Sequence, residues 1–272
     1  MQNLSQYKAK ILGRINPELA AELSRIDGYD IAPEEKIAAF DMDGTLIEGD
    51  IGEAVFCYLK ASGNDIPLKW KDYLEMIEAK EFKKGFCDII TSMEGMNIKT
   101  ITNSAKNLIS SNSEVITFTE DGIEYNYPIP KPIPEMQNLM VYLKISGWKI
   151  SVISSSSHIS VRSMTDFLFK LNPDYVRGIK TEIYVTDNYE DLFTAKVQGT
   201  VPFRKGKAEV FSDMFGNIQP LITAGDSLGD VELLNLTSEK GLVMLCGKNS
   251  SNIEFLKKSL SNNMKIIEFK VK

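Results

Sequence analysis

The chain has 272 residues with 31 basic and 37 acidic side chains, which gives a formal net charge of −6. This charge argues against a general affinity for nucleic acid or for anionic membranes. The sequence shows no secretory signal and no apolar run long enough to span a bilayer, and its three widely spaced cysteines form no metal or redox motif. We therefore expect a cytoplasmic protein that binds neither nucleic acid nor membrane.

The N-terminal part of the chain is predicted to form one helix over residues 4–26. Its apolar face consists of Ile11, Leu12, Ile15, Leu19, Ala20 and Leu23. We interpret this helix as an extension packed on a domain, with a partner-binding helix as the alternative. A buried strand is predicted over residues 36–40, and it stops abruptly at Asp41.

Residues 50–112 are predicted to be largely helical, with helices near 51–61, 68–82 and 99–110. A short hairpin follows, in which Asp121-Gly122 connects strands over 114–119 and 123–127. Prolines between residues 128 and 134 then predict a stiff, extended connection. This composition indicates a mainly helical insert framed by two linkers.

Strands and helices alternate in the rest of the chain. Strands are predicted over 148–153, 220–224 and 241–245, a β-hairpin over 178–198, and helices over 135–145, 159–171, 205–215 and 231–236. Such alternation predicts an α/β protein with a parallel sheet covered on both faces. Three strands end in polar side chains: the first at Asp41 and Asp43, another at the serines from 154, and a third at Asp226 and Asp230.

These strand ends belong to four motifs in order, FDMDGTL, VISSSS, RKGKAEV and AGDSLGD. With them, the sequence from about residue 36 onward resembles the haloacid dehalogenase (HAD) superfamily of phosphatases and phosphotransferases. The resemblance implies a Rossmann-like catalytic core over residues 36–49 and 131–272. It also implies a small helical cap over 50–130, with residues 1–35 as a helical extension of the core.

The resemblance implies a role for each acidic residue of the motifs. Asp41 would be the nucleophile that forms an aspartyl-phosphate, and it would also bind the metal. Asp43 would offer the metal its backbone carbonyl, while its side chain protonates the leaving oxygen and later deprotonates water. Asp226 would be a second metal ligand, and Asp230 would orient metal-bound water. Clustered carboxylates would repel a phosphate, so a hard cation must bridge them, and Mg²⁺ suits oxygen ligands.

The remaining motif residues are expected to hold the phosphate. Ser154 would contribute its hydroxyl and Ser155 its backbone N–H, although the serines could instead cap the following helix. Lys205 would supply the positive charge, and the family spacing favours it over Lys207.

Gly44 and Thr45, which turn the chain after the first motif, are also expected at the phosphate or substrate. The lone histidine, His158, is predicted to begin a helix rather than to act as a base.

The predicted cap provides the only indications of the substrate. Its position is similar to that in the phosphoserine phosphatase branch, and the run DIGEAVF is similar to phosphorylcholine phosphatases. In that comparison Asp50 and Glu53 would meet a substrate amine. The aromatic residues that could enclose a quaternary ammonium, or could simply form the cap core, are Tyr58, Trp70, Tyr73, Phe82 and Phe86. Serines in the second motif and Gly44 depart from the phosphoserine phosphatase pattern and disfavour phosphoserine.

We therefore expect a Mg²⁺-dependent phosphomonoesterase that hydrolyses a small phosphorylated metabolite, of the phosphoserine, phosphocholine or phosphoethanolamine type. A dehalogenase is disfavoured by Asp43, because dehalogenases lack that second aspartate. The alternatives are a phosphotransferase or mutase of the same fold, and a non-catalytic phosphometabolite-binding or scaffold protein. Loss of a motif residue would favour the scaffold, and none is missing.

Overall fold

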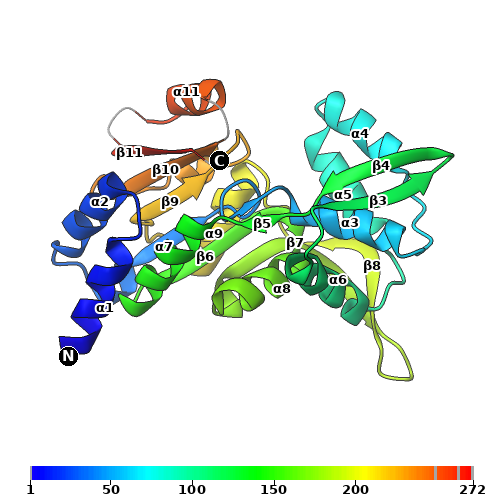
Figure 1. Cartoon of the computed structure of the whole chain (residues 1–272), viewed down its shortest axis with the longest axis horizontal. Helices are drawn as coiled ribbons and strands as arrows, with labels where there is room; N and C mark the ends of the chain where they lie inside the picture. The colour runs from blue at the N-terminus through cyan, green and yellow to red at the C-terminus, as the bar shows by residue number, and fades with distance from the viewer. Residues whose placement is uncertain (1, 248–249, 262–263, 271–272) are drawn as a thin grey trace.

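A seven-stranded sheet forms the centre of the protein in the computed structural model, which describes residues 2–247, 250–261 and 264–270. Its strand order is β11-β10-β9-β1-β6-β7-β8 (Figure 1). Neighbouring strands are parallel from β11 to β7, and only β8 runs antiparallel, against β7. The strands are β1 (Ile37–Phe40), β6 (Lys149–Ser157), β7 (Val176–Val185), β8 (Asp191–Gln198), β9 (Ile222–Gly225), β10 (Leu242–Gly247) and β11 (Ile266–Lys270).

Helices cover both faces of this sheet, as β1 shows. Ala38 and Phe40 belong to the main core, which includes side chains of α7 (Pro134–Ile145) and α8 (His158–Phe169). Ile37 and Ala39 point to the opposite face, where side chains of α9 (Lys205–Phe215) and α10 (Val231–Leu234) cover them. Successive residues of a strand face opposite sides, so a strand covered on both faces is apolar throughout. The predicted α/β fold is confirmed.

The N-terminal segment forms two helices, α1 (Gln2–Leu12) and α2 (Pro17–Asp27), so the prediction of a single helix is wrong. The break has a local cause. The Asn16 side chain accepts hydrogen bonds from the backbone N–H groups of Glu18 and Leu19, and Pro17 occupies the first helical position. Both features favour the start of a new helix. The predicted apolar face is nevertheless buried in the main core, at Ile11, Ile15, Leu19 and Leu23.

Residues 50–130 lie together at one end of the sheet, near β7 and β8 (Figure 1). They comprise α3 (Ile51–Ala61), α4 (Trp70–Glu78), α5 (Phe82–Thr91), α6 (Ile98–Ser110) and the hairpin of β3 (Val115–Glu120) and β4 (Ile123–Pro128). The hairpin and three of the helices confirm predictions, whereas α5 was not predicted. The chain enters and leaves this region through a two-stranded sheet of β2 (Ile47–Glu48) and β5 (Lys131–Pro132). The division into cap and core stays a prediction.

The C-terminal part adds two elements that were not predicted, α11 (Ser250–Lys258) and the edge strand β11. Ile253 and Leu256 of α11 pack on Val243 and Leu245 of β10. Short 3₁₀ helices occur at Pro33–Glu35 and Pro173–Tyr175. No helix in the described ranges combines the length and the apolar character needed to cross a bilayer.

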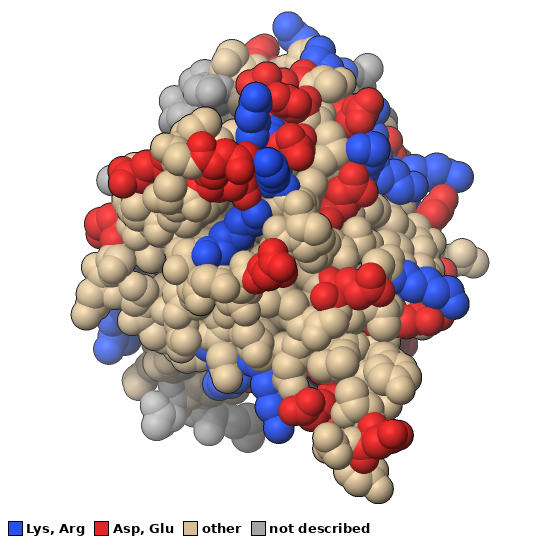
Figure 2. Space-filling model, turned by 90° about the vertical axis from the view of Figure 1, so that its right-hand side faces the viewer, with Lys and Arg blue, Asp and Glu red and all other residues tan. Residues whose placement is uncertain are grey.

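Figure 2 shows the end of the molecule formed by residues 50–130, where basic and acidic side chains alternate over the surface. Several of them form ion pairs, including Lys69 with Asp121, Lys71 with Glu75, and Lys84 with Asp88. Exposed pairs of this kind contribute little stability each. Basic and acidic side chains are thus interspersed on this face.

Candidate active site

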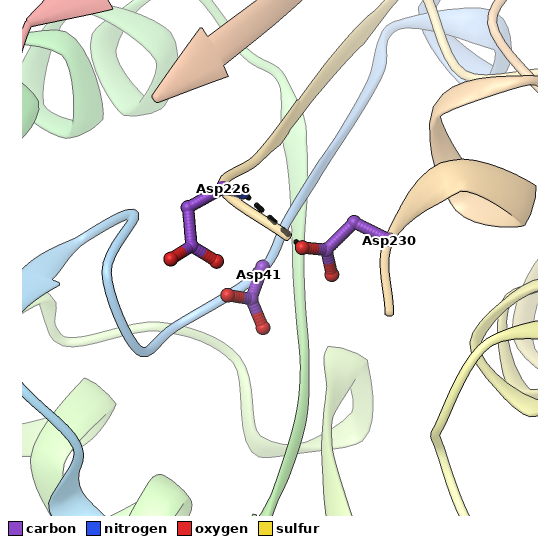
Figure 3. Close-up of side chains that lie close together, drawn as sticks. All are labelled: Asp41, Asp226 and Asp230. Carbon is purple, nitrogen blue, oxygen red and sulfur yellow. Dashed lines mark hydrogen bonds between the residues drawn. The ribbon is translucent and has the colours of Figure 1, made fainter. Parts of the chain in front are cut away.

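The site lies where three neighbouring parallel strands end. β9, β1 and β6 are adjacent in the sheet, so their carboxyl ends meet at one edge, where ligands bind in open α/β sheets. Asp41 follows β1, and Asp226 follows β9. Figure 3 shows the side chains of Asp41, Asp226 and Asp230 lying close together. Each of the three offers one carboxylate oxygen within 4.8 Å of the others.

Crowding raises the proton affinity of these carboxylates. Burial, followed by the negative charge of Asp230, raises the pKa of Asp41 well above its ordinary value. The same two causes raise the pKa of Asp226 to about 7. Carboxyl groups in such an arrangement repel one another unless positive charge is supplied. Their oxygen atoms are the ligands that Mg²⁺ prefers.

Part of that positive charge comes from Lys207. Its Nζ lies 2.5 Å from Oδ1 of Asp41 and 2.5 Å from Oδ1 of Asp230, and its side chain is only 4% exposed. The Lys205 side chain is 84% exposed and pairs with Glu209. The preference for Lys205 is therefore wrong: the lysine beside Asp41 is Lys207.

Helical phase explains why only one of the two lysines reaches the site. Residues two apart on a helix face nearly opposite directions, whereas residues three or four apart share a face. Lys207 precedes Val210 and Phe211 by three and four residues, and both of these are buried. This spacing was visible in the sequence, and it would have identified Lys207.

Asp230 holds the lysine and the loop that carries Asp226. Its Oδ2 accepts hydrogen bonds from the N–H of Asp226 at 3.2 Å and from the N–H and hydroxyl of Ser227, both at 3.0 Å. Figure 3 marks the first of these bonds. Asp230 is fully buried. Its oxygens are thus occupied by Lys207 and this loop, which fits a supporting role behind Asp41 and Asp226.

Asp43 lines the cavity beside Asp41, but its carboxylate turns toward α3 and β6. Oδ1 accepts the N–H of Ile51 at 2.8 Å, and Oδ2 accepts the hydroxyls of Ser154 at 2.7 Å and Ser156 at 2.9 Å. Burial raises the pKa of Asp43, against the opposing effect of these hydrogen bonds. The residue is therefore fixed at the cavity wall and holds a proton more readily than a solvated aspartate.

The serines of the second motif belong to β6, which continues to Ser157. Their side chains alternate along the strand. Ser154 is fully buried and donates to Asp43, whereas Ser155 lines the cavity and donates to the carbonyl of Pro202 at 2.8 Å. The prediction that Ser154 presents its hydroxyl to phosphate is thus wrong, and Ser155 is the serine that reaches the cavity. The helix-capping alternative also fails, since Ser157, which precedes α8, makes no side-chain cap bond.

Gly44 faces the cavity, whereas Thr45 is buried behind Asp41. Gly44 lines the cavity with φ of +75°, and a Cβ there would lie 2.1 Å from Oδ2 of Asp226. Only glycine leaves room for that carboxylate. Thr45 is fully buried, and its hydroxyl donates to Oδ2 of Asp41 at 3.4 Å. Thr45 therefore supports Asp41 from behind and does not face the cavity.

The two predicted amine-binding acids are separated by the structure. Asp50 lines the cavity and caps α3, accepting the N–H of Glu53 at 2.8 Å. Glu53 is absent from the described cavity lining. Its carboxylate instead accepts the hydroxyls of Tyr73 at 2.6 Å and Tyr127 at 2.7 Å. Contact between Glu53 and a substrate amine is therefore contradicted by its position.

The cavity has a volume of about 740 Å³. Of the predicted aromatic residues, Phe82 and Phe86 line it, whereas Trp70 and Tyr73 are buried in the core. His158 begins α8, as predicted, and its Nδ1 accepts the N–H of Gly178 at 3.3 Å. Burial and nearby cationic side chains lower the pKa of His158 to about 3.

The cavity lining also includes residues that the sequence interpretation missed, among them Phe203, Arg204, Asn252 and Phe255. Arg204 is the first residue of the third motif and Phe203 precedes it, so this motif was the available signal for both. For Asn252 and Phe255 of α11, nothing in the sequence pointed to the site.

Solved structures share this architecture. A conserved protein of unknown function from Anaerococcus prevotii DSM 20548 matches with a TM-score of 0.65 and 16% identity, over 93% of this chain and 92% of that one. A HAD family hydrolase from Salmonella enterica serovar Typhi matches with a TM-score of 0.58 and 16% identity, over 87% and 68% of the two chains. The chain has the HAD fold.

A phosphoserine phosphatase solved as a phospho-aspartyl intermediate analogue matches this HAD fold with a TM-score of 0.53 and 16% identity, over 87% of this chain and 94% of that one. Comparison with family models and with curated protein sequences gives no match. The structural likeness, at these identities, concerns the fold. It agrees with the fold that the four sequence motifs implied.

Proposed function

We propose that the chain is a Mg²⁺-dependent phosphomonoesterase that works through an aspartyl-phosphate on Asp41. The observation that carries the proposal is the environment of Asp41. This buried carboxylate borders the cavity, is paired with Lys207 and lies next to Asp226. A nucleophile, a cation and a metal-ligand candidate at the end of one strand are what phosphoryl transfer requires.

The residues present fit a divalent cation. The site brings together the four carboxylates of Asp41, Asp43, Asp226 and Asp230, whereas its described basic side chains are Lys207 and Arg204, so negative charge exceeds positive charge. Asp41 and Asp226 would hold the ion, together with the backbone carbonyl of Asp43. When bound, Mg²⁺ would neutralise charge on the phosphate oxygens.

The protein side chains divide the chemistry between them. An oxygen of Asp41 attacks phosphorus, a new O–P bond forms, and the bond from phosphorus to the alcohol oxygen breaks. Asp43, in its protonated form, gives its proton to that departing oxygen, for which its side chain turns from Ser154 and Ser156 toward the cavity that it lines. The oxygen of a water then attacks phosphorus while Asp43 takes a proton from it. The bond between the Asp41 oxygen and phosphorus breaks, which frees inorganic phosphate and restores the Asp41 carboxylate. Lys207 keeps the carboxylate of Asp41 in place and offsets charge on the transferred group.

The proposed substrate is a phosphorylated metabolite. The motif resemblance favoured an amine-containing alcohol, and Asp50 is the one acid of the predicted pair that faces the cavity. Burial and the charges of Asp43 and Glu53 raise the pKa of Asp50 well above its ordinary value. A nearby ammonium group would favour the ionised form. Asp50 is therefore the residue through which the site supports an amine-containing substrate.

The test is a screen of phosphorylated metabolites with and without Mg²⁺, including phosphocholine, phosphoethanolamine and phosphoserine. The proposal expects release of phosphate that requires the metal and disappears in Asp41→Asn. Equal release by Asp41→Asn would contradict it. Binding of a phosphorylated compound without turnover, under every metal condition, would favour the non-catalytic alternative.

A further inference from the structure

Part of the cavity lining is aromatic. It consists of Phe82 and Phe86 of α5, Phe203 of the loop before α9, and Phe255 of α11, which we call the aromatic wall. They come from three parts of the chain that are far apart in sequence. The cavity therefore combines a carboxylate and lysine end with a separate set of phenyl rings.

Three of these rings form one packed cluster. The ring centroids of Phe86 and Phe203 are 5.7 Å apart with planes at 72°, and those of Phe82 and Phe203 are 6.3 Å apart. Edge-to-face and tilted pairs at these distances are favourable aromatic contacts. The cluster joins α5 to the loop that precedes α9, because Phe203 packs on two residues of α5.

The cluster is also fixed relative to the carboxylates. A Cβ at Gly229 would lie 3.3 Å from the Phe203 ring, so this ring packs on the loop that carries Asp226 and Asp230. The N–H of Arg204 donates to the carbonyl of Gly229 at 3.0 Å. Arg204 has φ of +51°, which non-glycine residues adopt rarely. These contacts hold Phe203 at a fixed distance from the loop that carries Asp226 and Asp230.

Part of the apolar lining of the cavity is exposed to solvent. Phe255 is 57% exposed and Leu228 is 39% exposed, although both line a concave surface. Apolar side chains in a cavity are the usual contact surface for the apolar part of a ligand. A volume of about 740 Å³ also leaves room for much more than a phosphate and a short alkyl chain.

A quaternary ammonium fits this wall less well than a ring. The guanidinium of Arg204 lies over the Phe203 ring, 5.7 Å from its centroid, so this ring already has a cation as its neighbour. A substrate cation at the same ring would be repelled by this like charge. The four rings are all phenylalanine, whereas tryptophan is the strongest partner for a cation.

We propose that the site takes phosphate monoesters whose alcohol carries a planar aromatic or heteroaromatic ring, which packs against Phe203, Phe86 and Phe255. The inference rests on the proposed phosphomonoesterase function and specifies its substrate class. The phosphate lies at Asp41 and Lys207, and the ring lies at the aromatic wall.

The test compares 2-phenylethyl phosphate with propyl phosphate, because both are esters of primary alkyl alcohols and leave with similar ease. Phosphocholine is the third substrate. We expect kcat/KM for 2-phenylethyl phosphate to exceed the other two values by at least about tenfold, the factor expected from burying a phenyl group. Phe203→Ala and Phe255→Ala should each reduce this ratio several-fold. Phe167→Ala, at an exposed position of α8 outside the cavity lining, should leave the ratio unchanged.

Binding of non-hydrolysable analogues gives a second readout that does not depend on turnover. The phosphonates that match the two alkyl esters are 3-phenylpropylphosphonate and butylphosphonate, and the first should bind at least about tenfold more tightly. Equal kcat/KM and equal Kd for each pair would overturn the inference and leave the phosphatase proposal intact. Preference for phosphocholine would also overturn it. Absence of turnover for all three esters, with tight phosphonate binding, would instead contradict the phosphatase proposal while supporting the ring site.

Discussion

Lys207 Nζ and Asp41 Oδ1 are 2.5 Å apart and buried, with Asp230 on the other side of the lysine. Removing one partner of such a pair leaves an uncompensated charge. Burial alone would lower the pKa of Lys207, but the two aspartates outweigh it and raise the pKa. The ammonium group therefore holds its proton more firmly than that of a solvated lysine.

Lys207→Met should lower kcat by about 10²- to 10³-fold, the usual effect of losing one preorganised charge-stabilising group. It should also lower the free energy of unfolding by about 3 kcal/mol at pH 8, because Asp41 and Asp230 lose their counter-ion. Steady-state kinetics and thermal melts measure the two effects. Lys205→Met is the matched control, since Lys205 is exposed and pairs only with Glu209 in the described contacts. A larger loss of kcat or of stability in Lys205→Met than in Lys207→Met would contradict the assignment of Lys207 to the site.

The stability of the metal-free protein should fall as pH rises from about 4 to 8. The folded-state pKa of Asp226, about 7, lies above its ordinary value of 3.8. Its stabilising contribution is therefore fully present below pH 3.8 and is lost as pH rises through 7. Asp41 and Asp50, whose pKa values are also raised, act in the same direction. Melting curves in the presence of a chelator, at several pH values, measure this dependence.

Mg²⁺ should reverse that loss at high pH. At about 100 times its Kd the ion should add ~2.7 kcal/mol at pH 8, and much less at pH 5, where protons compete for the carboxylates. Asp226→Asn should abolish most of the gain in Tm. A gain that is the same at pH 5 and pH 8, or that persists in Asp226→Asn, would show that the ion binds elsewhere.

Gly44→Ala should disable the site through sterics. A Cβ at this position would lie 2.1 Å from Asp226 Oδ2, so the carboxylate would have to move. We expect Mg²⁺-dependent stabilisation and turnover to be lost together. Gly63→Ala is the control, because Gly63 has a similar φ of +79° and its Cβ would meet nothing within 4 Å. Both variants carry the backbone penalty of about 1 kcal/mol for a positive φ. Only Gly44→Ala also displaces the carboxylate of Asp226.

Tyr127→Phe should lower the free energy of unfolding by about 1–3 kcal/mol, because the buried carboxylate of Glu53 loses one of its two tyrosine donors. Urea or thermal unfolding measures the loss. Tyr189→Phe, at a position that is 90% exposed, should have no effect. Equal stability of the Tyr127→Phe variant would mean that the hydroxyl is replaced by water, and that Glu53 is more accessible than its contacts indicate.

Much of this architecture could be predicted because its causes are local. The apolar strand before Asp41, the Asp121-Gly122 turn and the alternation of strands and helices are all explicit in the sequence, and each was confirmed. The single N-terminal helix was wrong because the Asn16 cap and Pro17 outweigh the continuous apolar pattern.

The fine geometry of the site needed the structure. The spacing of the family motif favoured Lys205 as the lysine of the site. Lys207 is the buried one, because it lies on the same helix face as Val210 and Phe211. Ser154 and Ser155 differ only in the direction that strand alternation gives their side chains. The aromatic wall could not be predicted, because Phe86, Phe203 and Phe255 line one cavity only after three separate elements fold together.

The central claim is that Asp41 forms a covalent bond to phosphorus during turnover. The most direct measurement is mass spectrometry of the protein quenched in acid during hydrolysis of 2-phenylethyl phosphate or another accepted ester in the presence of Mg²⁺. The account predicts one added phosphoryl group on the peptide that contains Asp41, and none in Asp41→Asn, which should also lack turnover. Full turnover by Asp41→Asn, or a phosphoryl group on any other residue, would contradict it.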